Sequence, residues 1–241
     1  MTSKVDYNKR LFSKGSLRSV FHLARFYWVK KAIEEYSIST EKVIELGCFD
    51  GKLIDYLPKK PKKYKGFDAN WESGLDLAKV KYKNNDSFEF NLARTPKEMN
   101  LHSFEKFDLA VCMETLEHIP PEIVCDYLKE LANHLDGHIL ITVPNEKGIF
   151  FLLKRLLKPK GIEGDDYNFS IMDYINITLN RTNEVERDEH KGFDYEHLIY
   201  DVRKYFDIIS VKGFSMNKVI PKFLSFGIGI IAKPKKIYKS L

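Results

Sequence analysis

Cysteine is scarce in this chain, with three residues, Cys48, Cys112 and Cys125, among 241. Their number is odd, and no two of them have the Cys-x-x-Cys spacing of a metal site. Two lie in apolar runs that are typical of buried positions. We therefore expect reduced thiols and no disulfide framework, which favours a cytoplasmic protein.

Long apolar stretches are missing as well. The first 15 residues are polar and basic, and the longest apolar runs elsewhere are far shorter than the roughly 20 residues of a membrane-spanning helix. We expect a cytoplasmic protein that is soluble, or peripheral to a membrane at most.

The chain also lacks a strong excess of charge. Its 39 basic and 34 acidic residues give a net charge of +5, and 30% of the residues are charged. This balance favours an anionic partner only weakly and mostly describes a solvated surface. The hydrophobic content of 44% is enough for one sizeable core, so we expect one α/β domain with appendages.

The most informative stretch is residues 43–57, where a short apolar run stops at Gly47 and resumes with helical spacing after Gly51. This pattern predicts a buried strand, a tight turn and a helix. The two glycines let the backbone approach a ligand closely, and the first turn of the helix leaves N–H groups unpaired in the same space. A nucleotide-like ligand suits such a turn, although an ordinary strand-turn-helix unit is the alternative. The Gly-x-Gly-x-x-Gly pattern of dinucleotide sites is absent.

The run Glu-Leu-Gly-Cys-Phe-Asp-Gly at residues 45–51 resembles the first motif of the class I S-adenosylmethionine (SAM)-dependent methyltransferases. In that family an acidic residue precedes a glycine turn around the methionine part of the cofactor. The sequence departs from the family at Phe49, where a glycine is usual. The resemblance implies a Rossmann-like, seven-stranded α/β sheet, mostly parallel with an antiparallel last strand, and SAM as cofactor.

Other strand ends extend the predicted cofactor site. Asp68 ends the strand predicted over residues 64–68, about where α/β nucleotide sites place a carboxylate on ribose. In the family, residues just after the third strand contact adenine, which implies Asn91 and Leu92 here. The cofactor-binding set is Glu45, Gly47, Cys48, Phe49, Gly51, Asp68, Ala69, Asn91, Leu92, Cys112, Met113 and Glu114.

The apolar run at residues 107–113 predicts a buried parallel strand, and it leads into Glu-Thr-Leu-Glu-His-Ile-Pro at residues 114–120. These residues resemble the family's fourth motif and follow the carboxyl end of a strand, where open α/β sheets bind ligands. Glu114, Glu117 and His118 have the spacing that places three side chains on one face of a helical turn.

Together with the distant His190, this motif resembles the magnesium-type site of small-RNA 3′-end 2′-O-methyltransferases, and a related pattern occurs in quinone-biosynthesis O-methyltransferases. Glu114, Glu117, His118 and His190 are therefore candidate ligands for Mg²⁺ or Mn²⁺, and His118 and Glu117 are the candidate catalytic residues. In the alternative without a metal, Glu114 shapes the cofactor pocket, Glu117 faces solvent and His118 is a general base.

The remaining segments complete the predicted domain of residues 41–235. A helix should run from Pro121 to Leu135 with Gly137 after its end, followed by a strand over 137–145. Residues 146–190 form an insertion that is a substrate lid, a surface for docking on a membrane, or a helical cap on the core. Asp194 can cap a helix that ends at Tyr205. The strands predicted over 206–214 and 224–233 are joined by a short loop, so they must be antiparallel.

Residues 1–40 should form an amphipathic helical cap, and residues 236–241 a tail. In similar methyltransferases such helices cover the cofactor, and Arg18, His22, Arg25 or Trp28 could meet its carboxylate. A packing helix with a solvated basic face is the simpler alternative for each of these residues.

The sequence thus predicts a SAM-dependent methyltransferase acting on a hydroxyl of a small molecule, such as a quinone or phenol precursor, a sugar or a glycan intermediate. The Asp/Asn-Pro-Pro-aromatic motif of nucleic-acid amino methylators is absent, because residues 113–116 read Met-Glu-Thr-Leu. A metal-dependent RNA 2′-O-methyltransferase and a SAM-binding subunit without turnover are the alternatives.

Overall fold

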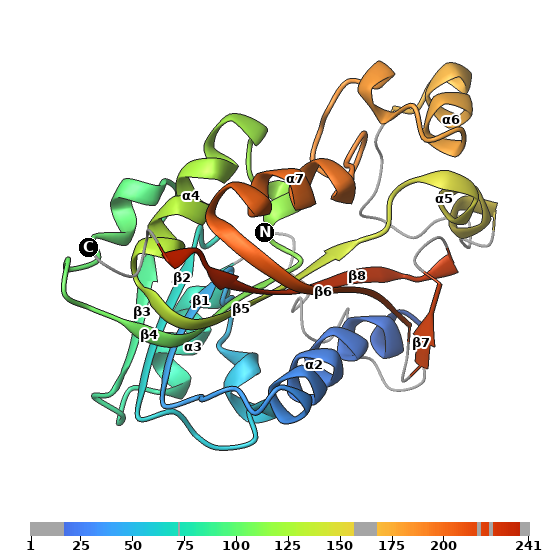
Figure 1. Cartoon of the computed structure of the whole chain (residues 1–241). Helices are drawn as coiled ribbons and strands as arrows, with labels where there is room; N and C mark the ends of the chain where they lie inside the picture. The colour runs from blue at the N-terminus through green and yellow to red at the C-terminus, as the bar shows by residue number, and fades with distance from the viewer. Residues whose placement is uncertain (1–16, 72, 157–167, 216–217, 222–223, 237–241) are drawn as a thin grey trace, which may run out of the picture.

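The computed structural model describes residues 17–71, 73–156, 168–215, 218–221 and 224–236. Its centre is a single sheet in the order β3-β2-β1-β4-β5-β8-β6-β7, with helices on both faces (Figure 1). The predicted domain boundaries stay predictions.

The first five strands of this order are parallel. They are β3 (Phe88–Leu92), β2 (Lys63–Asp68), β1 (Lys42–Leu46), β4 (Phe107–Met113) and β5 (Leu135–Pro144). Strand order reverses direction between β1 and β4, so the carboxyl ends of these two strands open a crevice at a topological switch point.

The last strands are antiparallel, as the short predicted connection requires. The final strand β8 (Gly227–Pro234) lies between β5 and β6 (Phe206–Ser215) and runs antiparallel to both. The predicted loop between β6 and β8 contains a three-residue edge strand, β7 (Lys218–Ile220), in addition to the seven expected strands.

Two helical layers cover the sheet. On one face lie α4 (Pro121–Asn133) and α7 (Tyr195–Tyr205), and on the other lie α2 (Leu17–Glu35) and α3 (Gly74–Lys81) (Figure 1). Each face has its own apolar cluster, with Leu128 and Val202 buried on the first and Val29 and Leu75 on the second. The sheet is therefore buried on both faces, as its continuous apolar strands predict.

Two predicted elements differ from those in the structure. The helix after the glycine turn is a short 3₁₀ helix, η1 (Lys52–Tyr56). Strand β5 begins at Leu135, so Gly137 lies inside the strand and not after a helix end. A Cβ atom at Gly137 would lie 1.8 Å from the carbonyl oxygen of Asp108, so glycine there permits the close approach of β4.

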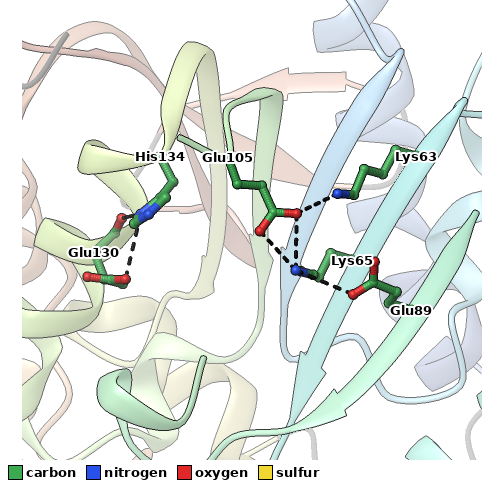
Figure 2. Close-up of polar contacts among 6 residues, drawn as sticks. All are labelled: Lys63, Lys65, Glu89, Glu105, Glu130 and His134. Carbon is green, nitrogen blue, oxygen red and sulfur yellow. Dashed lines mark hydrogen bonds and ion pairs between the residues drawn. The ribbon is translucent and has the colours of Figure 1, made fainter. Parts of the chain in front are cut away.

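A polar network lies near the amino ends of the parallel strands, opposite the switch-point crevice (Figure 2). The buried Lys65 ammonium is 2.9 Å from the carboxylate of Glu105 and 3.3 Å from that of Glu89. Lys63 also pairs with Glu105, and nearby His134 contacts Glu130 at 3.6 Å. The pair of Lys65 and Glu105 compensates two charges that the sheet would otherwise bury alone.

The insertion between β5 and α7 contains α5 (Gly148–Leu156), α6 (Ile171–Thr178) and the 3₁₀ turn η4 (Thr182–Glu184). These elements bury a small apolar cluster of their own, formed by Phe151, Ile177 and Val185. They expose other apolar side chains, a feature that both the expected lid and the expected membrane surface require. None of the helices in the described part of the chain combines the length and apolar content needed to cross a bilayer.

Candidate functional site

A cavity of about 570 Å³ opens at the carboxyl ends of β1, β2 and β4. Loops after β1, β2, β3 and β4 form its walls, together with α2 and the start of α4. Nine of the predicted site residues line it: Glu45, Gly47, Cys48, Phe49, Asp68, Ala69, Met113, Glu114 and His118.

The glycine turn after β1 is fixed by a neighbouring loop. Gly47 has a φ of +77°, and a Cβ atom there would lie 2.0 Å from the Oγ1 atom of Thr115. The Thr115 hydroxyl in turn donates to the carbonyl oxygen of Met113 at 3.0 Å. Gly47 therefore allows the loops after β1 and β4 to meet at the cavity.

Phe49, the departure from the family motif, fits this turn. It adopts a φ of +45°, as a glycine would, and its ring packs against Gly74, where a Cβ atom would lie 2.2 Å from the ring. Gly51 closes the turn, because its N–H donates to the carbonyl oxygen of Cys48 at 2.8 Å. Gly51 does not line the cavity. A bulky residue at position 49 thus leaves the cavity open.

Two carboxylates face the cavity from β1 and β2. Asp68 accepts hydrogen bonds from the backbone N–H groups of Phe49, at 3.0 Å, and Asn70, at 2.7 Å. Burial raises the pKa of Asp68, and these two bonds oppose the shift. Glu45 is buried and accepts a hydrogen bond from the Tyr64 hydroxyl. Burial also raises the pKa of Glu45 well above its ordinary value.

The wall at the end of β3 differs from the predicted one. Asn91 and Leu92 do not line the cavity, whereas Ala93 and Arg94 do. The N–H of Ala93 donates to the carbonyl oxygen of Asp68 at 3.0 Å and turns the chain toward the cavity. Cys112 belongs to β4 and is fully buried in the apolar core.

Of the two helical-cap candidates whose side chains the structure describes, Arg25 and Trp28, one reaches the cavity. Arg25 lines the cavity from α2. Trp28 instead stacks on Phe214 and fills the space above Gly229, so it is part of the interface between α2 and the sheet. The side chains of Arg18 and His22 lie outside the described residues.

Glu114 and Glu117 follow β4; Glu114 is partly buried and Glu117 is buried. Glu114 lines the cavity with a φ of +49°; burial raises its pKa, and the Arg25 guanidinium opposes the shift. Glu117 is fully buried, which rules out the solvent-facing alternative, and neither of its carboxylate oxygens has a hydrogen-bond partner among the described residues. Burial and the Glu114 charge raise the pKa of Glu117 well above its ordinary value. A buried carboxylate without hydrogen bonds lowers the stability of the fold unless a cation or a proton compensates its charge.

Two histidines meet beside Glu117. The rings of His118 and His190 pack edge to face with centroids 4.7 Å apart. One potential ligand atom from each of Glu117, His118 and His190 lies within 4.8 Å of the others, whereas Glu114 is not part of this group. Burial lowers the pKa of His118, and the Glu189 carboxylate opposes the shift. The structure thus brings together three of the four predicted metal ligands, although 73 positions of sequence separate Glu117 from His190. Imidazole nitrogens with a carboxylate suit a divalent transition metal.

Several residues of the site were not predicted. Arg94, Trp71, Tyr127 and Glu189 line the cavity. Arg94 is the second residue after a predicted strand, which is the one available signal. The others reach the cavity through packing of distant segments.

Comparisons with known proteins agree with this geometry. Residues 20–202 match a family model described as a methyltransferase domain. A ubiquinone biosynthesis O-methyltransferase from Salmonella paratyphi A is 26% identical over 114 residues, which are 47% of this chain and 46% of that protein. The chain thus spans less than half the length of this curated relative.

Solved structures share the fold over nearly the whole chain. An S-adenosylmethionine-dependent methyltransferase from Clostridium acetobutylicum superposes with a TM-score of 0.62 at 18% identity, covering 95% of this chain and 96% of that one. The methyltransferase domain of a bacterial Hen1 protein superposes with a TM-score of 0.57 at 15% identity, covering 88% and 99%.

Proposed function

The chain belongs to the methyltransferase domain family, and from this premise we propose that it is a SAM-dependent enzyme that methylates a hydroxyl group on a small molecule with the help of a divalent cation. The observation that carries the proposal is the buried Glu117 carboxylate facing His118 and His190 next to the cofactor cavity. The partial similarity to a ubiquinone biosynthesis O-methyltransferase supports the choice of an oxygen acceptor.

SAM supplies an electrophilic methyl group, and the chain must bind the cofactor and align an acceptor with it. We assign the ribose hydroxyls to Asp68, whose two oxygens keep further acceptor capacity beyond the backbone bonds that fix them. Arg25 is the cation placed to meet the methionine carboxylate. Ala93 and Arg94 take the adenine-side position that the sequence assigned to Asn91 and Leu92.

A hydroxyl is a poor nucleophile until it loses its proton. Mg²⁺ or Mn²⁺ bound by Glu117, His118 and His190 would lower the pKa of such a hydroxyl. Glu117 would bring the negative charge that balances the ion, and the apolar walls at Ile119 and Ile123 would exclude water from the acceptor. Acceptors with neighbouring hydroxyls suit this chemistry, which favours a catechol-like quinone precursor or a sugar.

The test is methyl transfer from radiolabelled SAM to 3,4-dihydroxybenzoate and to methyl α-mannoside, with protein stripped by a chelator and then supplied with Mg²⁺ or Mn²⁺. We expect turnover to fall at least tenfold on stripping and to return with the ion. Full turnover by the stripped protein would overturn the cation and leave His118 as the general base.

An RNA 2′-O-methyltransferase is the second candidate, because the same Glu117, His118 and His190 group matches the resemblance noted in the sequence. An RNA with an unmodified 3′-terminal ribose should then be methylated, and its binding should weaken steeply with salt. Binding that is insensitive to salt would count against this candidate. The subunit without turnover loses its motivation, because the turn accommodates Phe49.

A further inference from the structure

The carboxylate of Glu146 lies behind the histidine of the proposed cation site. Glu146 is 8% exposed, and its Oε1 atom is 3.6 Å from the Nδ1 atom of His190. That nitrogen is itself buried, and its 3.6 Å separation from Glu146 is an ion-pair distance, longer than a hydrogen bond. The imidazole therefore lies next to a carboxylate on one side, and it also offers a ligand atom to the group with Glu117 and His118.

Glu146 has a firm support. It is the second residue after β5, and the residue between them, Asn145, is fixed by two hydrogen bonds. The Asn145 N–H donates to the carbonyl oxygen of Phe226 at 3.0 Å, and the Asn145 side-chain amide donates to the carbonyl oxygen of Ser225 at 3.1 Å. The Lys154 ammonium of α5 forms an ion pair with the same Oε1 atom of Glu146. The carboxylate is thus held between a strand end and a helix of the insertion.

His118 repeats this arrangement in a more open form. Its Nδ1 atom is 3.4 Å from the Oε2 atom of Glu189, a residue that lines the cavity and is 44% exposed. Both histidines therefore turn the same ring nitrogen toward a carboxylate. A metal-binding histidine commonly donates its second ring N–H to a carboxylate, which fixes the tautomer and the orientation of the ring.

We propose that Glu146 is a positioning residue for His190: it keeps the proton on Nδ1, so that Nε2 is the nitrogen offered to the group with Glu117 and His118. Lys154 supports this role because it holds the Glu146 carboxylate in place from α5. The inference rests on the proposed function, since it assigns Glu146 to the same cation site. It also connects the insertion to that site, because loss of α5 would release Glu146.

The first experiment reads the tautomer directly in the wild-type protein without metal. With ¹⁵N-labelled histidine, two-dimensional NMR at a pH where the ring is neutral should show His190 protonated at Nδ1. A His190 ring protonated at Nε2 would overturn the proposal whatever the metal does.

The second experiment measures Mn²⁺ affinity by electron paramagnetic resonance with S-adenosylhomocysteine (SAH) present. Glu146→Gln should bind Mn²⁺ about 10- to 100-fold more weakly, while its affinity for SAH stays within twofold. Glu186→Gln is the matched control, because Glu186 is exposed and lies in the insertion four positions before His190. This variant should bind Mn²⁺ as the wild type does.

The outcomes separate the two proposals. If the wild-type protein binds no Mn²⁺, the cation in the proposed function fails, and the tautomer experiment alone decides the role of Glu146. If the wild type binds Mn²⁺ and Glu146→Gln binds it equally well, the positioning role fails and the cation stands.

Discussion

At the scale of single residues, the turn after β1 depends on the absence of one side chain. A methyl group at Gly47 would overlap the Thr115 side chain, and the φ of +77° would strain any other residue. We expect Gly47→Ala to weaken SAH binding at least tenfold, corresponding to about 1–3 kcal/mol of backbone strain. Isothermal titration calorimetry measures this change.

A second substitution makes the Gly47 prediction specific. Thr115→Ala removes the Oγ1 and Cγ2 atoms that the new methyl group would meet at 2.0 and 2.7 Å and leaves the Cβ atom at 2.8 Å, so the double variant should recover part of the lost affinity. Wild-type affinity in Gly47→Ala alone would show that the turn does not need to approach the loop after β4.

The residues at strand ends could be predicted from the sequence because the change from an apolar run to a polar or glycine residue marks where a buried strand ends. Gly47, Asp68 and Glu114 follow this rule and line the cavity. The adenine-side residues were placed two positions too early: the end of β3 at Leu92 was predicted correctly, but the cavity is lined by Ala93 and Arg94 beyond that end and not by the last two residues of the strand. Glu189 escaped prediction because only tertiary packing brings it to the cavity.

At the scale of elements, the helix α7 is held by a buried ion pair at its first turn. Asp194 accepts from the N–H of Glu196 as the predicted cap, and it also pairs with the Lys147 ammonium at 2.6 Å. Both side chains are 6% exposed. The capping role was predictable from the sequence, whereas the pairing with Lys147, from a segment 47 residues away, was not.

We expect Asp194→Asn to lower the free energy of unfolding by about 2–3 kcal/mol, somewhat below the usual loss from breaking a buried pair because Glu196 remains beside Lys147. Asn keeps the cap, so the loss reports the ion pair. Urea unfolding measures it. Asp201→Asn, which breaks a more exposed pair with Lys204 on the same helix, is the control and should leave the free energy of unfolding close to the wild-type value.

The pH dependence of this loss has a defined sign. Burial alone would raise the pKa of Asp194, but the hydrogen bond from Lys147 and the cap bond bring it below its ordinary value of 3.8. The stabilisation is therefore complete above that value and is lost as the pH falls through the lower folded pKa. The difference between wild type and Asp194→Asn should shrink below about pH 4. A difference that stays constant to pH 2 would contradict the assignment.

At the scale of the whole molecule, the topology was the most predictable feature. The alternation of apolar strands and helical segments specifies the parallel half of the sheet, and the short connection before β8 specifies its antiparallel end. The edge strand β7 was not predictable, because three residues carry no periodic pattern. The arrangement of the insertion was left open for a similar reason, since its elements are short.

The division of the core suggests how the molecule opens. The cluster of Phe151, Ile177 and Val185 within the insertion is separate from the two clusters that flank the sheet. Segments that bury little apolar surface open at lower free energy than the global unfolding transition. We expect amides of α5 and α6 to exchange hydrogen at least tenfold faster than those of the central strands β4, β5 and β8 when followed by mass spectrometry.

Ligands should change that pattern at one place. If the Lys154 and Glu146 pair connects α5 to His190, SAH with Mn²⁺ should slow exchange in α5 more than in the edge strand β3, which has no contact with the cation site. The Lys154→Met variant should lose this protection in α5 while SAH still protects the turn after β1. Equal protection of α5 in both proteins would show that the insertion closes over the site by contacts other than this ion pair, because the same ligands would then stabilise it without Lys154.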